Sequence, residues 1–319
     1  MHRMGWRLSK RLARFPLVTR AIVPFERAGV RLTYQVHDRW LANPQSRELF
    51  LATPPVLDDV QQRIAEGLRK DGVAVIPFDE LVRDPGSWQR IRDEADRFVA
   101  SAERVVTGGG EERAHLRKKH LVRRHPLDVE LPLDDSCLRL AVSSRLLDVV
   151  NSYLGMFAKC LYVDQWYTVP GGPEAERVSS QRWHRDYTDQ QLVKVFIYMR
   201  DVDRGAGPFE FVPGSAQSGR YGQLWPWRPL GDTYPPPAEF ERRIPASAIA
   251  TYEGPAGTVI FCNTSGFHRG GFATERPRVM TVYNYASPAS LNALAKRNFR
   301  LPPGARLDDL PPAARFALS

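Results

Sequence analysis

Cysteine is scarce and scattered in this chain of 319 residues. Cys137, Cys160 and Cys262 are far apart and form no Cys-x-x-Cys pair, so neither a disulfide framework nor a thiolate zinc site is indicated. No apolar run approaches the roughly 20 residues that a membrane span requires, and the N-terminus lacks the short apolar core of a secretory signal. We therefore expect a globular, intracellular protein, most simply a cytoplasmic one.

Positive charge is abundant only at the N-terminus. The net charge is +9, and residues 1–31 hold eight basic residues against the single acid Glu26, which is +7 of that total. A nucleic-acid-binding enzyme should line its working face with basic residues, so we expect no nucleic-acid partner. Apolar residues such as Trp6 and Phe15 lie among the arginines. Residues 1–50 are predicted to form a basic, helical arm that contacts an acidic membrane or protein partner, or packs on its own domain.

The sequence pattern changes from helical to extended near Met156. Helices are predicted over about 56–70, 85–103 and 136–154, with a short strand from Gly72 and a left-handed helix stop at Gly155. Beyond Met156, short stretches rich in Val, Ile and aromatic residues are separated by Gly and Pro, which favours a sandwich or barrel. We predict one mainly β domain over residues 51–319, with flanking helices and a β core at about 156–290.

Two irregular segments are expected near the site. The stretch that begins at Gly108 is glycine-rich and then charged, which indicates a loop. Residues 219–246 are dense in Pro, Trp and Arg, and proline at this frequency prevents regular structure. We expect this insertion to cover the barrel mouth, because Trp225 and Trp227 would otherwise be exposed.

The segment "WHRD" places His184 and Asp186 two residues apart, just before the strand-forming "LVKVFIYM". Both side chains would leave one face of a strand, although such a pair alone could be hydrogen-bonded at the surface. Of the seven histidines, only His268 also lies among the later strands. Two histidines and one carboxylate on one face of an iron ion leave positions open for a bidentate co-substrate and O2. A zinc site is less favoured, because structural zinc sites are closed and usually contain thiolates.

An iron site of this type commonly needs an anchored 2-oxo acid to reduce O2. The distal carboxylate of that acid needs a cation that can bind it through two hydrogen bonds. Arg278 lies ten residues beyond His268 and begins the next strand, and a guanidinium fork suits a carboxylate. Arg276 is the competing candidate, but it precedes Pro277 in the turn. We therefore prefer Arg278.

With "WHRD", "VKVFIYMRDVDRGAGPFEFVPGS", "GTVIFCNTSGFHRGG" and "RPRVMTVYNY", the sequence resembles the phytanoyl-CoA dioxygenase family of iron(II)/2-oxoglutarate-dependent oxygenases, over roughly residues 56–290. The resemblance implies a double-stranded β-helix, a jelly-roll or cupin-like core. It implies that His184, Asp186 and His268 bind Fe(II) and that Arg278 pairs with 2-oxoglutarate.

The same resemblance implies two weaker contacts with the co-substrate. Gln165 matches a family position that contacts 2-oxoglutarate, and Phe196 matches one that packs against it. A basic side chain before the first sheet also touches the co-substrate in relatives, and Lys119, Arg123 and Arg124 are the candidates here.

The implied reaction is oxidation, most simply hydroxylation, of an unactivated C–H bond in a small-molecule or specialised-metabolite substrate, with release of succinate and CO2. Asp186 is present, whereas halogenating relatives of this fold replace this carboxylate by Gly or Ala. The aromatic residues and arginines of the insertion suit a substrate with apolar carbon and an anionic or polar handle. Two alternatives stay open: a catalytically silent jelly-roll binding protein, and a cupin-type enzyme that uses another metal.

Overall fold

The computed structural model describes residues 28–29, 32–108, 120–126, 128–172, 175–216, 219–227, 234–290 and 297–319. Most of the predicted basic arm, and Lys119 with most of the predicted loop after Gly108, lie outside the described residues. Among the residues that are described, no helix combines the length and the apolar character needed to cross a membrane.

The largest element is a six-stranded sheet in which every neighbouring pair is antiparallel. Its order is β1-β8-β5-β10-β4-β2, so strands far apart in the sequence lie side by side. The strands are β1 (Val73–Pro77), β2 (Leu121–Arg123), β4 (Lys159–Thr168), β5 (Leu192–Tyr198), β8 (Thr258–Cys262) and β10 (Arg278–Ala286).

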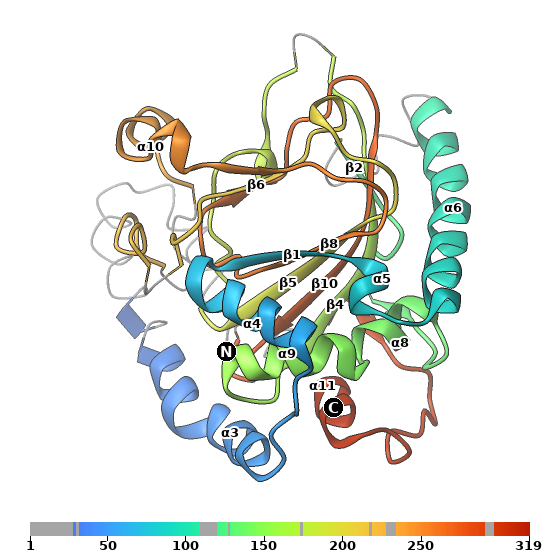
Figure 1. The fold of residues 1–319 in the computed structure, drawn as a ribbon, viewed down its shortest axis with the longest axis vertical. Helices are drawn as coiled ribbons and strands as arrows, with labels where there is room; N and C mark the ends of the chain where they lie inside the picture. Colours follow the sequence, from blue (N-terminus) through green and yellow to red (C-terminus); the bar gives the residue numbers. More distant parts are fainter. Residues whose placement is uncertain are drawn as a thin grey trace, which may run out of the picture.

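A smaller antiparallel sheet lies opposite one face of the large sheet (Figure 1). It contains β6 (Phe209–Phe211), β7 (Ala250–Tyr252) and β9 (His268–Arg269). Phe196 of β5 meets Phe209 of β6 with ring centroids 4.9 Å apart, and both belong to one buried apolar cluster. A separate pair, β3 (Val129–Glu130) and β11 (Phe299–Arg300), is parallel. The described strands therefore form mainly antiparallel sheets that enclose a shared core.

Helices cover the other face of the large sheet (Figure 1). They are α4 (Asp59–Asp71), α5 (Phe78–Leu81), α6 (Pro85–Thr107), α8 (Ser136–Ala141), α9 (Ser144–Leu154) and α11 (Pro312–Leu318). Strand residues alternate between the two faces, so Val195 and Ile197 pack on the helices while Phe196 faces the smaller sheet. Gly72 ends α4 at φ 79°, a conformation that glycine adopts without a steric penalty, and β1 begins at the next residue.

The prediction of a single helix over 136–154 is wrong, because the structure has two helices, α8 and α9, in this stretch. Asp135 caps α8 by accepting a hydrogen bond from the Leu138 amide. The chain then turns at Val142 and Ser143, where the Ser143 hydroxyl donates to the Leu140 carbonyl, and α9 starts anew. The predicted stop at Gly155 is confirmed, because this residue ends α9 at φ 65°.

Side-chain hydrogen bonds hold the described part of the N-terminal segment against the rest of the protein. It comprises a helical stretch over 32–36, η1 (His37–Leu41) and α3 (Asn43–Ala52). The Tyr34 hydroxyl donates to the Asp189 carboxylate at 2.5 Å. Asn43 accepts from the Ala289 amide, and Ser46 donates to the Phe157 carbonyl. This part of residues 1–50 is thus packed on the domain.

The contact between Tyr34 and Asp189 generates a test of this packing. Burial raises the pKa of Asp189 to about 6, although hydrogen bonds from Tyr34 and Ser287 oppose the rise. Tyr34→Phe should lower the free energy of unfolding by about 1.5–3 kcal/mol at pH 8, where Asp189 is a carboxylate. At pH 5 Asp189 is protonated in the folded protein, so the loss should be smaller.

Urea denaturation at both pH values measures this difference. Tyr187→Phe is the control, because Tyr187 is exposed and its change should stay within about 0.5 kcal/mol. An equal loss for Tyr34→Phe at pH 5 and pH 8 would show that Asp189 is not the partner that matters.

Candidate active site

Backbone hydrogen bonds bring the three predicted metal ligands together. The amide of His184 donates to the carbonyl of His268, and the amide of His268 donates back to His184, both at 3.0 Å. The amide of Asp186 donates to the Thr264 carbonyl at 2.8 Å. As a result, one ligand atom from each of His184, Asp186 and His268 lies within 4.8 Å of the other two. This donor set of two imidazoles and one carboxylate suits non-haem iron(II).

Both imidazoles are oriented for metal binding by backbone carbonyls. Nδ1 of His184 lies 2.8 Å from the Arg182 carbonyl, and Nδ1 of His268 lies 3.0 Å from the Gly266 carbonyl. A proton on each Nδ1 satisfies these carbonyls and makes Nε2 the ring nitrogen that can bind a metal. Burial, with a further contribution from His184, holds the pKa of His268 well below its usual range, so this ring is neutral at neutral pH.

Lys194 lies beside the triad, and the sequence reasoning missed it. Its Nζ is 2.6 Å from Oδ2 of Asp186. Burial raises the pKa of Asp186, but Lys194 and the two histidines outweigh it and hold the pKa below its usual range. Lys194 is two residues before Phe196 on β5, so both side chains face the same side of the strand. This two-residue spacing from Phe196 was the feature of the sequence that could have identified Lys194 as a pocket residue.

Arg278 lines a pocket that His184, His268 and Lys194 also line, and only 3% of its surface is exposed. Its Nε and Nη1 have no hydrogen-bond partner among the described residues. A buried guanidinium without partners is costly, and a bidentate carboxylate would satisfy it. The pocket is lined by three kinds of residue: imidazoles, cations with small polar side chains, and large apolar side chains. They are His120, Leu121, Trp166, Thr168, Ser180, Gln181, His184, Lys194, Phe196, Phe209, His268, Gly270, Arg278 and Met280.

The competing arginine points elsewhere. Arg276 is 48% exposed and forms an ion pair with Asp203, which is 49% exposed. It therefore has a partner at the surface, whereas Arg278 faces the pocket. This contrast favours the assignment of Arg278 to a carboxylate ligand.

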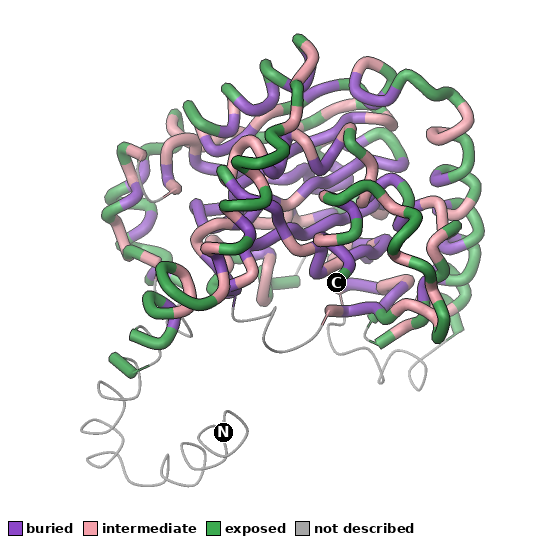
Figure 2. The backbone as a smooth tube through the Cα atoms, turned by 90° about the horizontal axis from the view of Figure 1, so that it is seen from below, coloured by how far each residue is buried: buried purple, intermediate pink, exposed green. Residues whose placement is uncertain are grey.

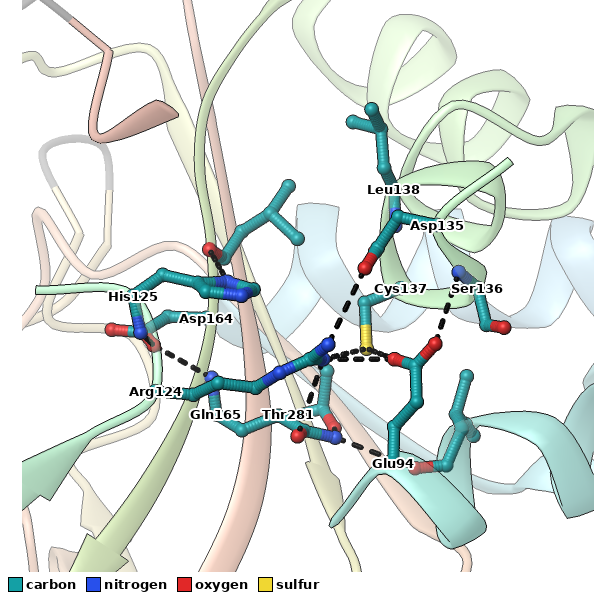
Figure 3. Close-up of polar contacts among 12 residues, drawn as sticks. Glu94, Arg124, His125, Asp135, Ser136, Cys137, Leu138, Asp164, Gln165 and Thr281 are labelled. Atoms are coloured by element: carbon teal, nitrogen blue, oxygen red, sulfur yellow. Dashed lines mark hydrogen bonds and ion pairs between the residues drawn. The ribbon is translucent and has the colours of Figure 1, made fainter. Parts of the chain in front are cut away.

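Gln165 is not brought to the pocket, and the expectation that it contacts 2-oxoglutarate is not supported. Its Nε2 is 3.3 Å from Oγ1 of Thr281 and 3.4 Å from the Ile91 carbonyl, and its Oε1 accepts from Arg124 at 3.5 Å (Figure 3). Trp166, one residue later on β4, lines the pocket instead. Because neighbouring strand residues face opposite sides, an error of one position moves a residue to the wrong face.

Arg123 and Arg124, two candidates for a further co-substrate contact, are each paired with acids. Arg123 Nε lies 2.7 Å from Asp164. Arg124 lies 2.8 Å from Glu94 and 3.5 Å from Asp135. Lys119, the third candidate, lies outside the described residues. The pocket-lining residues from this part of the chain are His120 and Leu121.

A second group of possible ligands, Glu94, Asp135 and Cys137, already contains a cation. The three side chains are close enough to hold a metal, but the guanidinium of Arg124 lies among them, with Nη1 3.8 Å from Sγ of Cys137 (Figure 3). Burial raises the pKa of the Cys137 thiol well above its usual range. Since a metal binds the thiolate, this group is better described as a buried ion-pair network.

The insertion predicted over 219–246 contacts the metal-ligand segment directly. The Trp227 indole donates to the Asp186 carbonyl at 2.9 Å, and the Tyr234 ring stacks on His184 at 5.4 Å between centroids. Arg185 lies between the two ligands in sequence and donates to the Tyr221 and Leu224 carbonyls. Arg228 of the insertion is outside the described residues. Tyr221, Leu224, Trp227 and Tyr234 thus lie beside the ligand segment. The expectation that 219–246 lacks regular structure is wrong in part, because α10 (Pro237–Arg243) is a short helix that accepts proline in its first turn.

A triad of this composition beside a buried arginine defines a non-haem iron(II)/2-oxoglutarate-dependent oxygenase. The comparison with family models agrees. Residues 68–280, more than half of the chain, match the family described as Phytanoyl-CoA dioxygenase (PhyH). The chain belongs to this family. A search of curated proteins gave no match.

Several solved structures are similar to this chain at low sequence identity. The epimerase SnoN in complex with Fe3+, alpha ketoglutarate and nogalamycin RO is 21% identical, with a TM-score of 0.47 over 72% of this chain and 84% of that one. EctD from S. alaskensis with bound Fe is 17% identical, with a TM-score of 0.46 over 74% and 80%. HygX from Streptomyces hygroscopicus with nickel and 2-oxoglutarate is 16% identical, with a TM-score of 0.45 over 73% and 88%.

The position of Arg278 predicts a specific loss of co-substrate affinity. Arg278→Lys keeps the charge but removes the fork, so the affinity for 2-oxoglutarate should fall by roughly tenfold to a hundredfold, about 1–3 kcal/mol. Calorimetric titration of the metal-loaded protein measures this. Arg276→Lys is the matched control and should bind 2-oxoglutarate normally. The assignment is wrong if the loss appears in Arg276→Lys and not in Arg278→Lys.

Proposed function

We propose that His184, Asp186 and His268 hold iron(II), that Arg278 holds the distal carboxylate of 2-oxoglutarate, and that Phe196 packs against this co-substrate. The observation that carries the proposal is the burial of Arg278 in a pocket that His184 and His268 also line, with two of its nitrogens lacking a hydrogen-bond partner in the part of the chain that the structure describes. A metal site with no 2-oxo acid would leave this buried cation without a role.

We also infer that the two facing sheets are the halves of a double-stranded β-helix. From β5 to β10, the chain alternates between the large and small sheets: β5 is in the large sheet, β6 and β7 in the small, β8 in the large, β9 in the small and β10 in the large. Such alternation is what a jelly roll requires. The ligands then come from the small-sheet side, at β9 and the segment paired with it, while Arg278 comes from the large sheet.

The chain's own side chains have separable tasks in this proposal. When bound, iron(II) supplies the activation of O2 that is coupled to conversion of 2-oxoglutarate to succinate and CO2. The carbonyls of Arg182 and Gly266 hold the imidazoles in the required orientation. Phe196, Phe209 and Met280 give the pocket apolar walls, which strengthen the pairing between Arg278 and a carboxylate by excluding water.

The substrate is inferred to be a small molecule with an apolar carbon and an anionic or polar handle. Lys194 supplies a cation within the pocket. Asn284 lies opposite Lys194 in the strand register, and its Oδ1 is buried without a hydrogen-bond partner among the described residues. These groups can fix the orientation of a substrate, and the apolar walls can hold the carbon that is oxidised. The oxidation of an unactivated C–H bond is the reaction this arrangement supports best.

The ligand assignment predicts loss of metal and activity without loss of fold. His184→Ala and His268→Ala should each abolish iron-dependent succinate formation from 2-oxoglutarate, because each removes one of three ligands. The bound iron per chain, measured by elemental analysis, should fall in parallel. Circular dichroism and the melting temperature should stay close to those of the parent, since the ligand segments lie outside the main apolar clusters.

Cys137→Ser provides the matched control for these variants. Cys137 belongs to the other possible ligand group, where Arg124 supplies the positive charge, so this variant should keep its iron and its turnover. Full activity in either histidine variant, or loss of iron in Cys137→Ser, would overturn the assignment.

A further inference from the structure

Large apolar side chains are exposed mainly in one short segment. Of the eleven exposed large hydrophobic residues among those described, seven lie between residues 32 and 56. The seven are Leu32, Val36, Trp40, Leu41, Leu49, Leu51 and Val56. Trp40 is 74% exposed, which is unusual because tryptophan side chains are highly buried on average. A concentration of this kind marks an interaction surface.

This segment makes its buried polar contacts with the protein and exposes several large apolar side chains among polar ones. Its buried contacts are made by Tyr34, Asn43 and Ser46, through the hydrogen bonds described above, while α3 exposes Leu49 and Leu51. An ordinary surface helix has the opposite arrangement, with its apolar stripe on the core. Figure 2 shows stretches of exposed backbone at the periphery of the molecule, and Figure 1 places α3 at the periphery, away from the sheets. Trp40, Leu41 and Leu51 therefore leave most of their apolar surface outside the packed domain.

The charge of the neighbouring sequence indicates what the apolar surface contacts. Residues 1–31, which lead directly into Leu32, carry a net charge of +7. Basic residues combined with exposed Trp and Leu are typical of segments that lie on the interface of an acidic membrane, where tryptophan sits at the level of the headgroups. An acidic bilayer is complementary to both features, because its interior accepts the apolar side chains and its headgroups attract the charge.

The N-terminal segment also contacts the insertion that lies beside the proposed metal ligands. The ring of Tyr34 lies 4.9 Å from the ring of Trp227, and the Trp227 indole donates to the carbonyl of Asp186. We propose that residues 32–56 bind the surface of a bilayer rich in acidic lipids, with the basic residues before them adding electrostatic attraction. Bound in this way, the enzyme holds Trp227 and the adjoining proposed ligand segment close to the membrane.

Vesicle binding of the full chain tests the proposal. The protein should co-sediment with vesicles of phosphatidylcholine and phosphatidylglycerol, and bind at least fivefold more weakly to pure phosphatidylcholine. High salt should weaken binding to the acidic vesicles, because it screens the charge. The double variant Trp40→Ala/Leu41→Ala should bind at least tenfold more weakly, since it removes two exposed apolar anchors.

A matched double variant controls for the loss of exposed apolar surface elsewhere. Val75 and Val178 are 45% and 47% exposed and lie outside the segment, so Val75→Ser/Val178→Ser should bind like the parent. The proposal fails if the parent protein does not bind acidic vesicles, or if Trp40→Ala/Leu41→Ala binds as well as the parent. A dimer in solution that this variant dissociates, with no vesicle binding, would overturn it in favour of self-association. Iron-dependent turnover of 2-oxoglutarate without vesicles should be the same in all variants, so this result is independent of the proposed metal site.

Discussion

The paired backbone hydrogen bonds between His184 and His268 are the constraint on which the site depends. They join the segment before β5 to β9, and the bond from the Asp186 amide to Thr264 extends the same pairing. Side-chain rotation alone could not hold three ligand atoms within a few ångströms of one another. The fold therefore sets the geometry of the ligands through the backbone, and the carbonyls behind each Nδ1 then fix the rings.

The second constraint is the burial of charge around this ligand set. Arg278 is buried without a described hydrogen-bond partner for two of its nitrogens, and Lys194 is paired only with the carboxylate of a proposed metal ligand. In a region of low dielectric such groups cost free energy unless a ligand compensates them. Under the proposed assignment, binding of 2-oxoglutarate and a metal ion would offset this cost, because the pocket presents groups that suit an anion and a cation. Arg124 differs from Arg278 in this respect, because its guanidinium is already paired with Glu94 and Asp135.

The sequence predicted the features that depend on local spacing. His-x-Asp before a strand, the histidine after the later strand and the arginine ten residues beyond predicted side chains that the structure brings together, the first three as one cluster and Arg278 in the pocket beside it. Prediction from the sequence failed where the outcome depends on which face of a strand a residue occupies, or on tertiary contacts. Gln165 differs from the pocket-lining Trp166 by one position, and no local pattern distinguishes the two faces of a strand buried on both sides. Lys194 was missed because its partner, Asp186, is supplied by another segment, and the break between α8 and α9 depends on a single turn at Ser143.

The most direct test of the account is an anaerobic titration of the iron(II)-loaded protein with 2-oxoglutarate, followed by visible absorption. If the co-substrate chelates iron held by His184, Asp186 and His268 while Arg278 binds its distal carboxylate, a charge-transfer band should appear that requires both iron and 2-oxoglutarate. It should saturate at one equivalent of each per chain. A folded, iron-loaded protein that develops no such band at saturating 2-oxoglutarate would contradict the account.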